Sequence, residues 1–450
     1  MVSRPDYKDS GLEWLGVVPD HWSLKKIKYL FWERKENNKP IQSENLISLT
    51  IEKGVIPHSE KTGGGNKPKE DLTKYKLVYP GDLVINSMNV IAGAVGISQY
   101  FGVVSPVYYM LIPQDKQSCP YYFHHMFRTE SFQKSLYGLG NGILIKENEE
   151  TGKLNTIRMR IPMDKLGDQV LPVPPPEEQK LISRYLDKKT EQIDSLIEKI
   201  QKKIELLKEQ RTSLINQCVT KGLDPNVEMK DSGVEWIGEI PSHWNLRKLT
   251  RFCDRVRNGY VGPTRDIMFE TGITYLQGIH TDKTGTITFT PNGPFYVSPD
   301  WSEKHKETIL RTDDIVVVQT GTIGNLGYVT EEFDGSNCHA MIIVSTDKTI
   351  CYGRYLMYSF LSSYVQNFLQ SIKTGEILHH INTKKLRLLN VLLPPLDQQR
   401  EIVGHLDRET YLIDRLLEKE GQRIGLLKEY RQSLISSVVT GKVRVTEDMI

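Results

Sequence analysis

Few residues of this sequence have the type and spacing that catalysis requires. Gly321, Gly324 and Gly327 follow an apolar run in the segment TGTIGNLG, where a glycine-rich loop can hold a phosphate group. The GxGxxG spacing is missing, and a tight turn, a bulge or a close approach of the backbone to a nucleic-acid strand explains such glycines as well. The sequence contains no GxxxxGK[ST], HExxH or GxSxG motif and no Asn-Pro-Pro-aromatic or Asp-Pro-Pro-aromatic tetrapeptide. These absences argue against an ATPase motor and an amino-methyltransferase.

Histidine and cysteine do not follow a metal-ligand pattern. His124 and His125 are adjacent, as are His379 and His380, and adjacent residues do not share one face of a helix. We interpret them as surface or core residues. The cysteines contain no CxxC pair, so we expect reduced packing residues and neither a disulfide framework nor a thiolate zinc site. They are Cys119, Cys218, Cys253, Cys338 and Cys351.

The sequence contains a long internal repeat. KDSGLEWLGVVPDHW from Lys8 and KDSGVEWIGEIPSHW from Lys230 are identical at ten of fifteen positions. PPPEEQKLISRYLD and LLKEQRTSLI in the first half correspond to PPLDQQREIVGHLD and LLKEYRQSLI in the second. A solenoid repeats every 20–50 residues or so, much more often than this. The pattern predicts a duplicated unit of two parts, a globular segment followed by a helix.

A 3.5-residue period of apolar positions predicts a long helix in each repeat. The prolines at 174–176 and 394–395 mark the starts, and Lys221-Gly222 and Gly441-Lys442 mark the ends. The positions of the two seams are Leu186, Thr190, Ile193, Ile197, Ile200, Ile204, Leu207, Arg211, Leu214 and Cys218, then Leu406, Thr410, Ile413, Leu417, Glu420, Ile424, Leu427, Arg431, Leu434 and Val438.

Two matched seams in one chain favour an intramolecular helix pair, antiparallel if a pseudo-twofold axis relates the repeats. A buried core helix and a homodimeric coiled coil are the alternatives. Arg211 and Arg431 interrupt the seams, where an arginine sets the register, faces a carboxylate partner or lies at a solvated edge. From 177 to 218, one helix would be roughly 60 Å long.

The rest of each half predicts mixed secondary structure. Apolar runs at Leu83–Ile85 and Ile315–Val318 follow polar turns and are typical of strands, and 123–136 and 355–369 have the pattern of amphipathic helices. The expected class is α+β, with two mixed α/β domains separated by two long helices that form an antiparallel intramolecular coiled coil, in a pseudo-twofold internal repeat. The expected segments are domain 1 (1–173), helix 1 (174–222), domain 2 (223–393), helix 2 (394–442) and a C-terminal tail (443–450).

Composition is typical of a globular chain. Of 450 residues, 38% are hydrophobic and 25% charged, and the net charge is +2. There is no apolar run of about 18 residues and no apolar N-terminal region, so we expect a cytoplasmic protein without a membrane partner. The small net charge excludes a histone-like polycation but leaves open DNA binding through local patches.

Taken together, the motifs closely resemble the DNA-specificity subunits of type I restriction–modification enzymes over nearly the whole chain. The openings SGLEWLGVVPDHW and SGVEWIGEIPSHW and the helix starts VPPPEEQ and LPPLDQQ carry the resemblance. GDLVINSMNVIAGAVGISQYFGVVSPVYYML and DDIVVVQTGTIGNLG are similar to two forms of the family's recognition domain.

The resemblance implies a non-catalytic subunit of a bacterial defence system. Domains 1 and 2 would be target-recognition domains, each docking on one half of an asymmetric, bipartite double-stranded DNA target, with the helices fixing the length of the spacer. Catalysis would belong to two modification subunits that bind S-adenosylmethionine and to restriction subunits that translocate and cleave DNA with ATP and Mg²⁺. No cofactor or metal is expected in this chain.

Sequence-specific contacts to DNA require arginine or lysine for guanine and asparagine or glutamine for adenine. These side chains are expected in loops that reach a groove. For every candidate the alternative is a solvated loop residue. The candidates are Lys61, Asn66, Lys67, Lys69, Asn86, Asn89 and Lys146 in domain 1, and Arg257, Asn258, Arg265, Gln277, Gln319, Thr322 and Lys373 in domain 2.

Residues that recur in both halves are expected to pack, because readout of two different half-sites requires residues that differ. They are the tryptophans Trp14, Trp22, Trp236 and Trp244, and the same argument makes His21 and His243 structural and not catalytic. Two other classes of protein compete with the specificity subunit. One is a fused restriction–methylation polypeptide trimmed to its recognition end, and the other is a coiled-coil scaffold that binds proteins.

Overall fold

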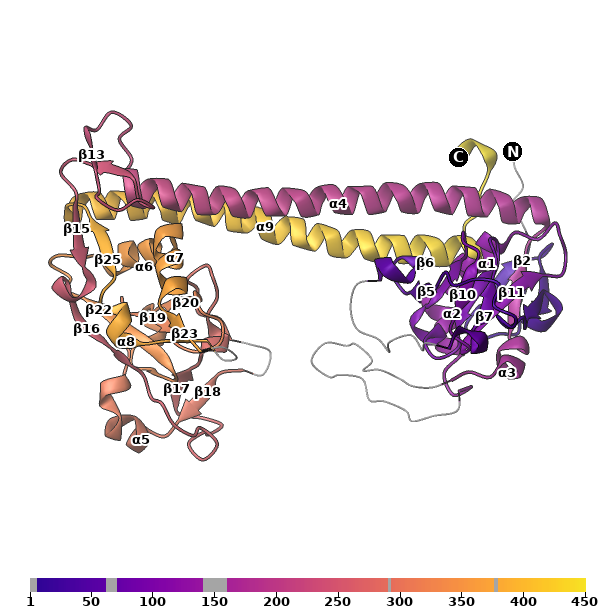
Figure 1. Cartoon of the computed structure of the whole chain (residues 1–450), viewed down its shortest axis with the longest axis horizontal. Coiled ribbons are helices and arrows are strands. Elements are labelled where there is room, and N and C mark those ends of the chain that lie inside the picture. Colours follow the sequence, from indigo (N-terminus) through magenta and orange to yellow (C-terminus); the bar gives the residue numbers. More distant parts are fainter. Residues whose placement is uncertain (1–5, 62–70, 141–159, 290–292, 376–378) are drawn as a thin grey trace. The chain divides into compact units, whose positions relative to one another are not determined.

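A computed structural model describes residues 6–61, 71–140, 160–289, 293–375 and 379–450. Contacts between residues divide the chain into two compact units, which we call unit 1 (Met1–Ile200 with Gln422–Ile450) and unit 2 (Gln201–Gly421). Each unit contains one globular domain and about half of each of two long helices, α4 (Pro176–Lys221) and α9 (Leu396–Val439) (Figure 1). The α+β class with two long helices is thereby confirmed.

The core of unit 1 is a four-stranded antiparallel sheet in the order β4–β11–β8–β9. Leu83 and Ile85 of β8 lie in the cluster that includes the side chains of α1, whereas Val84 lies in a second cluster on the other face. Burial on both faces explains why this strand is a continuous apolar run. The sheet strands are β4 (Phe31–Arg34), β8 (Leu83–Asn86), β9 (Val95–Ile97) and β11 (Tyr108–Pro113).

Shorter elements surround this sheet. Antiparallel pairs join β1 to β2, β3 to β12, β5 to β6 and β7 to β10. Their bounds are β1 (Tyr7–Asp9), β2 (Val17–Pro19), β3 (Ser23–Lys26), β5 (Ile47–Thr50), β6 (Gly54–Pro57), β7 (Lys76–Val78), β10 (Gly102–Val104), β12 (Val170–Val173), α1 (Pro120–Phe127), α2 (Glu130–Ser135) and α3 (Met163–Gly167).

Unit 2 repeats this plan with the sheet order β16–β22–β19–β20. On β19, Ile315 and Val317 face one cluster and Val316 the other, as on β8. The bounds are β13 (Met229–Asp231), β14 (Glu239–Pro241), β15 (Asn245–Lys248), β16 (Cys253–Asn258), β17 (Ile273–Leu276), β18 (Phe295–Val297), β19 (Ile315–Val318), β20 (Leu326–Tyr328), β21 (Asn337–Cys338), β22 (Met341–Thr346), β23 (Lys373–Thr374), β24 (His380–Ile381), β25 (Asn390–Leu393), α5 (Pro299–Lys304), α6 (Gly353–Leu361), α7 (Ser363–Ser371) and α8 (Thr383–Leu386).

A buried ion pair ties two sheet strands together in both units. Arg34 on β4 forms two hydrogen bonds with Asp82, at 3.0 and 3.1 Å, directly before β8. Arg255 on β16 contacts Asp314, directly before β19, and also donates to Ile309 O. Both carboxylates are buried, and the paired guanidinium supplies the hydrogen bonds that a buried charge requires.

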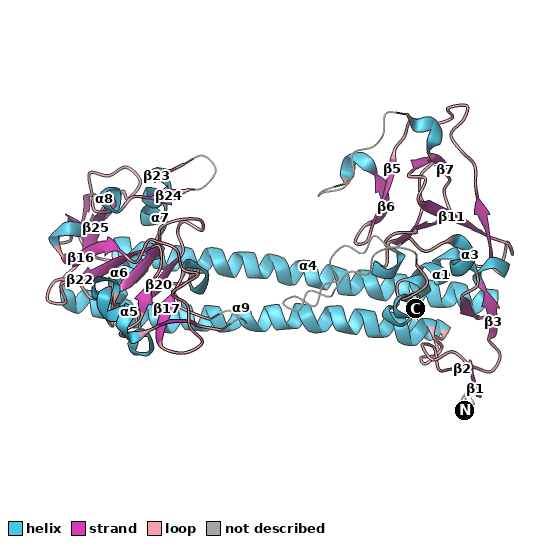
Figure 2. Ribbon diagram, turned by 90° about the horizontal axis from the view of Figure 1, so that it is seen from below, coloured by secondary structure: helices cyan, strands magenta, loops and turns pink. Residues whose placement is uncertain are grey.

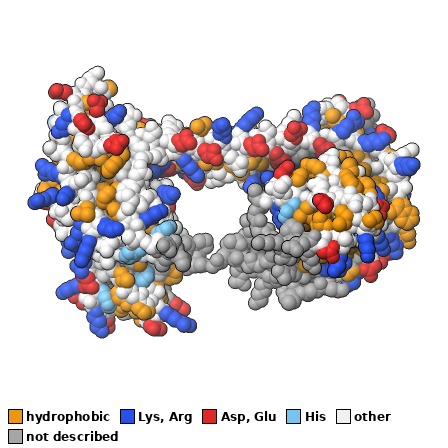
Figure 3. All heavy atoms as spheres, viewed as in Figure 1, with side chains coloured by type: hydrophobic (Ala, Val, Ile, Leu, Met, Phe, Trp, Pro, Cys, Tyr) orange, Lys and Arg blue, Asp and Glu red, His pale blue; other side chains and the backbone are white. Residues whose placement is uncertain are grey.

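The helices α4 and α9 are antiparallel within each unit, and they run side by side in two perpendicular views (Figures 1 and 2). In unit 1, Asp194 of α4 contacts Arg431 of α9, whereas in unit 2 Arg211 of α4 contacts Asp414 of α9. Within unit 2, Lys203 of α4 also contacts Glu420 of α9, so residue numbers fall along α9 as they rise along α4. All the predicted seam positions are buried or half-buried, so the predicted intramolecular coiled coil is confirmed. Acidic and basic side chains intermingle on the exposed surface of the helices (Figure 3).

Glycine ends both long helices in the left-handed conformation. Gly222 has a φ of +74° and Gly441 a φ of +77°. A Cβ on Gly222 would lie 3.1 Å from the ring of Trp244, and one on Gly441 would lie 2.3 Å from Pro19. Beyond α9 the chain returns to the core of unit 1, where Val445 is buried. The segment boundaries expected from the sequence stay a prediction.

The two amphipathic helices expected at 123–136 and 355–369 are each divided into two. α1 and α2 are separated at Thr129, and α6 and α7 at Ser362, where the backbone is extended. The Thr129 hydroxyl donates to Met126 O, and the Ser362 hydroxyl donates to Ser359 O. These side-chain bonds compete with the helical hydrogen bonds, so the expectation of one continuous helix was wrong in both domains.

Candidate nucleic-acid interface

Polar side chains gather at one end of the sheet in unit 2. Strands β16 and β19 both run antiparallel to β22, so their last residues lie at the same end of the sheet. Asn258 is the last residue of β16, and Gln319 directly follows β19. Gln319 Nε2 lies 3.4 Å from Asn258 Oδ1. Two of the candidate residues, 61 positions apart in the sequence, are therefore in contact.

The hairpin of β23 and β24 adds a histidine to this pair. Ile381 N donates to Gln319 O at 2.8 Å, which holds β24 against the end of β19. His380 Nε2 then lies 3.4 Å from Gln319 Nε2, and His380 Nδ1 lies 3.0 Å from Thr320 Oγ1. Thr383, at the start of α8, donates to Asn258 Oδ1. We call Asn258, Gln319, Thr320, His380 and Thr383 the amide cluster.

Sequence reasoning missed three members of the amide cluster. His380 was interpreted as a surface or core residue, and Thr320 and Thr383 were not singled out. Each joins the cluster through a long-range contact: Thr320 and His380 meet across 60 positions of the sequence, and Thr383 contacts Asn258 across 125. No local periodicity or motif marks such a meeting.

The backbone beneath the cluster is held in a tight arrangement. A Cβ on Gly259 would lie 2.5 Å from Cys338 Sγ and 2.6 Å from Cys338 O, so only glycine fits directly after Asn258. Ala340 has a positive φ of 49°, its N donates to Tyr260 O, and its O accepts from Gln319 N. Left-handed backbone at a residue other than glycine costs of order 1–3 kcal/mol and is concentrated at functional sites.

The other candidates of domain 2 lie outside the amide cluster. Lys373 is exposed on β23, opposite Ile381 of β24, and Thr322 is exposed in the turn after Thr320. Arg257 and Arg265 are exposed, and Gln277 N donates to His280 Nδ1 at 3.0 Å. No hydrogen bond among the described residues links the side chains of Arg265 or Gln277 to the amide cluster.

In domain 1, three candidates are described. Lys61 is partly exposed and Asn89 is exposed, whereas Asn86 is 8% exposed. Asn86 Oδ1 accepts from Met88 N at 3.0 Å, and Asn86 O accepts from Asn89 N, so this side chain builds the turn after β8. The other four, Asn66, Lys67, Lys69 and Lys146, lie outside the described residues.

The side chains of the amide cluster can donate and accept hydrogen bonds. Amides, hydroxyls and an imidazole can pair with the edges of bases, and the exposed Lys384 and Lys385 of α8 follow Thr383 directly and suit phosphate oxygens. Burial raises the pKa of Cys218 to about 11. Burial is also the main reason that the pKa of Cys338 is raised to about 12. These thiols are therefore protonated at neutral pH and poor nucleophiles.

Metal ligands and membrane spans are not found in the described part of the chain. Within residues 6–61, 71–140, 160–289, 293–375 and 379–450, no group of three His, Cys, Asp or Glu side chains is placed to hold a metal ion. The helices within the same ranges are too short or too polar to span a membrane. The cysteines, all five of which are described, are free thiols.

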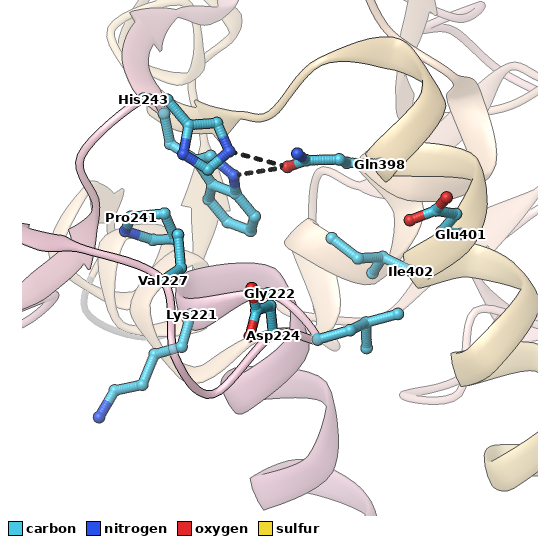
Figure 4. A pocket seen from close by; sticks show the side chains of 11 residues that line it. Lys221, Gly222, Asp224, Val227, Pro241, His243, Gln398, Glu401 and Ile402 are labelled. Atoms are coloured by element: carbon cyan, nitrogen blue, oxygen red, sulfur yellow. Dashed lines mark hydrogen bonds between the residues drawn. The ribbon is translucent and has the colours of Figure 1, made fainter.

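Residues shared by the two repeats lie where the long helices start. Trp22 and Trp244 are buried, as expected. Gln398 Oε1 accepts 3.0 Å hydrogen bonds from both His243 Nε2 and Trp244 Nε1, beside a pocket of about 320 Å³ that Gly222 and Ile402 also line (Figure 4). In unit 1, His21 Nε2 lies 2.8 Å from Glu178 Oε2.

The second pair of tryptophans does not share one environment. Trp14 packs edge-on against Phe132 at 5.4 Å between ring centroids, but Trp236 is 65% exposed. The expected packing role is therefore wrong for Trp236. Leu388 is also exposed, and it corresponds in the repeat to Asp168, which is ion-paired with Lys26 and Lys28. The surface at this position is therefore apolar in unit 2 and charged in unit 1.

Comparison with known proteins finds that this chain is similar to DNA specificity subunits of type I restriction systems. Residues 241–424 match the family model of the type I restriction modification DNA specificity domain. The chain is 22% identical over 444 residues to the putative type I restriction enzyme MjaX specificity subunit of Methanocaldococcus jannaschii, covering 96% of each chain. It is 22% identical to the EcoBI specificity subunit of Escherichia coli, over 81% of this chain and 74% of that one.

Solved structures share the fold. A chain solved in work on complex assembly and conformational transition of the type I R-M system has a TM-score of 0.64 and 14% identity, over 95% of this chain and 99% of that one. The HsdS subunit of Thermoanaerobacter tengcongensis has a TM-score of 0.51 and 14% identity, over 95% and 98% of the two chains.

Proposed function

We propose that this chain is a DNA-specificity subunit of a type I restriction–modification system and that it recognises a bipartite, asymmetric DNA target with a spacer of fixed length. The observation that best supports this proposal is that the same fold occurs twice, whereas the polar residues at the ends of the two sheets differ. Unit 2 places the amide cluster after β19, whereas in unit 1 Asn86 closes a turn at the end of β8. Two unlike recognition surfaces require two unlike half-sites.

The antiparallel helices are the element that would fix the spacer. Because the coiled coil is intramolecular, its length is set by this chain alone. B-DNA turns once in about 10–10.5 bp, so two domains on a stiff support meet the same face of a duplex only at certain separations. The Arg–Asp contacts in both units hold the register of the two helices.

Catalysis is assigned to partner subunits. The amide cluster offers hydrogen-bond donors and acceptors, and the cysteine thiols with raised pKa values are unsuited to nucleophilic attack. Two modification subunits would supply S-adenosylmethionine and the methyl transfer, and restriction subunits would supply ATP- and Mg²⁺-dependent translocation and cleavage. The complex would act in the cytoplasm on double-stranded DNA, and this chain would direct it to the target.

The test is to lengthen both helices. Insertion of four residues between Asp194 and Arg211 of α4, and between Asp414 and Arg431 of α9, keeps both Arg–Asp contacts. A four-residue insertion is a stutter, which a coiled coil accommodates by local unwinding. It lengthens each helix by about 6 Å, which is the length of roughly two base-pair steps. We expect methylation mapping to show a spacer longer by one or two base pairs between unchanged half-sites.

The matched control is the same insertion in α4 alone, which shifts one seam against the other. We expect this variant to lose thermal stability and methylation together. An unaltered spacer in the double-insertion variant, with methylation intact, would contradict the role proposed for the helices.

A further inference from the structure

The side chain of Asn258 is held in one orientation by its neighbours. Its Oδ1 accepts from Gln319 Nε2 at 3.4 Å and from the Thr383 hydroxyl. An amide nitrogen donates and an amide oxygen accepts. With its oxygen occupied inside the amide cluster, exposed Asn258 presents its Nδ2 donor group to the solvent.

The orientation is transmitted along a chain of hydrogen bonds. Gln319 is only 4% exposed, and its Nε2 faces both Asn258 Oδ1 and His380 Nε2 at 3.4 Å. A nitrogen that donates to His380 Nε2 requires this ring nitrogen to be the acceptor, so the proton lies on Nδ1, which faces Thr320 Oγ1 at 3.0 Å. Reversal of the Gln319 amide would therefore reverse Asn258 as well.

Resting on the function proposed above, we propose that Asn258 reads one base of the half-site bound by domain 2, as a hydrogen-bond donor, with Gln319 and His380 as positioning residues. In the major groove, guanine, adenine and thymine present acceptors at N7, O6 or O4, whereas cytosine presents its N4 donor. The base read by Asn258 is therefore one that carries an acceptor, and cytosine is disfavoured at this position.

The surroundings of Asn258 suit this role. Gly259 N donates to Met341 O at 2.8 Å, which fixes the backbone on the sheet, and the bonds to Gln319 and Thr383 fix the side chain before DNA binds. A side chain that is already ordered loses little conformational entropy on binding. The neighbouring Lys384 and Lys385 are exposed and suited to phosphates, which positions the base contact without selecting a sequence.

The first variant is Asn258→Asp. Its carboxylate still accepts from Gln319 and Thr383, so the contacts inside the cluster persist, but the outward donor becomes an acceptor. The full chain, assembled with its modification subunits, is used to select from a duplex library randomised at the target positions, and the bound DNA is sequenced. We expect one position of one half-site to shift toward cytosine by about tenfold or more, the other half-site remaining unchanged.

The second variant is Gln319→Glu, which changes nothing that faces the solvent. Its carboxylate can only accept, so Asn258 turns its Nδ2 inward and its Oδ1 outward. We expect the same position to shift in the same direction as in Asn258→Asp, a result that a merely structural role of Gln319 would not give.

The matched control is Asn382→Asp, which adds the same charge nearby. Asn382 Oδ1 accepts from Lys384 N at the start of α8, and aspartate caps a helix equally well. We expect weaker binding to all sequences with unchanged base preferences. If Asn258→Asp behaves like this control, or keeps the wild-type preferences, the inference is overturned. If the wild-type complex selects no bipartite sequence, the proposed function fails instead.

Discussion

Arg211 Nε on α4 lies 3.0 Å from Asp414 Oδ1 on α9, and the corresponding residues of the repeat, Arg431 and Asp194, meet at the same distance with the helices exchanged. Each arginine interrupts an apolar seam, and each finds its carboxylate on the opposite helix. A polar contact at a seam position specifies register, because a shifted pairing would leave the charge among apolar side chains.

The first prediction concerns the strength of this contact. The side chain of Arg211 is 12% exposed, but that of Asp414 is 41% exposed, so solvent screens the pair. We expect Arg211→Ala to lower the free energy of unfolding by about 1 kcal/mol. A double-mutant cycle with Asp414→Ala, followed by thermal or denaturant unfolding, should give a coupling of roughly 0.5–1 kcal/mol. Additive effects of the two substitutions would show that the contact does not contribute.

The second prediction compares one position in the two repeats. Trp244 Nε1 donates to Gln398, whereas Trp22 Nε1 is buried without a hydrogen-bond partner among the described residues. Gln398→Ala would leave the Trp244 donor unpaired and should cost about 1–3 kcal/mol. Glu178→Ala removes a carboxylate from the first turn of α4 and its contact with exposed His21, leaves no buried donor unpaired, and should cost less than about 1 kcal/mol. Equal losses of unfolding free energy would contradict this difference.

The third prediction concerns pH. His280 is fully buried between Phe289 and Phe295, and burial lowers its pKa below the ordinary 6.5. As the pH falls below 6.5, the unfolded chain binds a proton that the folded chain does not, so stability is lost as the pH falls. One such proton contributes a slope of up to about 1.4 kcal/mol per pH unit.

His280→Asn keeps an acceptor for Gln277 N and removes the titrating group. Unfolding of both proteins between pH 5 and pH 7 should give a shallower dependence in the variant. The same slope in both would show that His280 does not contribute.

The fourth prediction separates recognition from catalysis. The purified chain, incubated alone with target DNA and S-adenosylmethionine, should transfer no methyl group, because the methyltransferase is assigned to other subunits. Addition of the modification subunits should restore transfer. Methylation by the chain alone would favour the fused enzyme over a specificity subunit.

The long helices could be predicted from the sequence, but the amide cluster could not. A seam such as Leu186–Thr190–Ile193 repeats over many turns, so the local pattern alone determines the helix and its buried face. The ends of α4 and α9 were marked by Gly222 and Gly441, because a left-handed residue after a helix favours glycine.

The site depends on contacts between residues far apart in the sequence. Asn258 and Gln319 were candidates by residue type, but their contact requires the pairing of β16 and β19 with β22. Asn86 had the same type and a similar place, yet its side chain closes a turn. Residue type indicates what a side chain can bind, and only the tertiary structure shows whether it is free to do so.

The central claim is that this chain directs methylation to a bipartite, asymmetric target. Single-molecule methylome sequencing of cells that carry the intact operon, compared with cells that lack this chain, tests it most directly. The account predicts one motif with two different half-sites and a fixed spacer, which disappears with the chain. A continuous or palindromic motif, or a methylation pattern that does not depend on the chain, would contradict it.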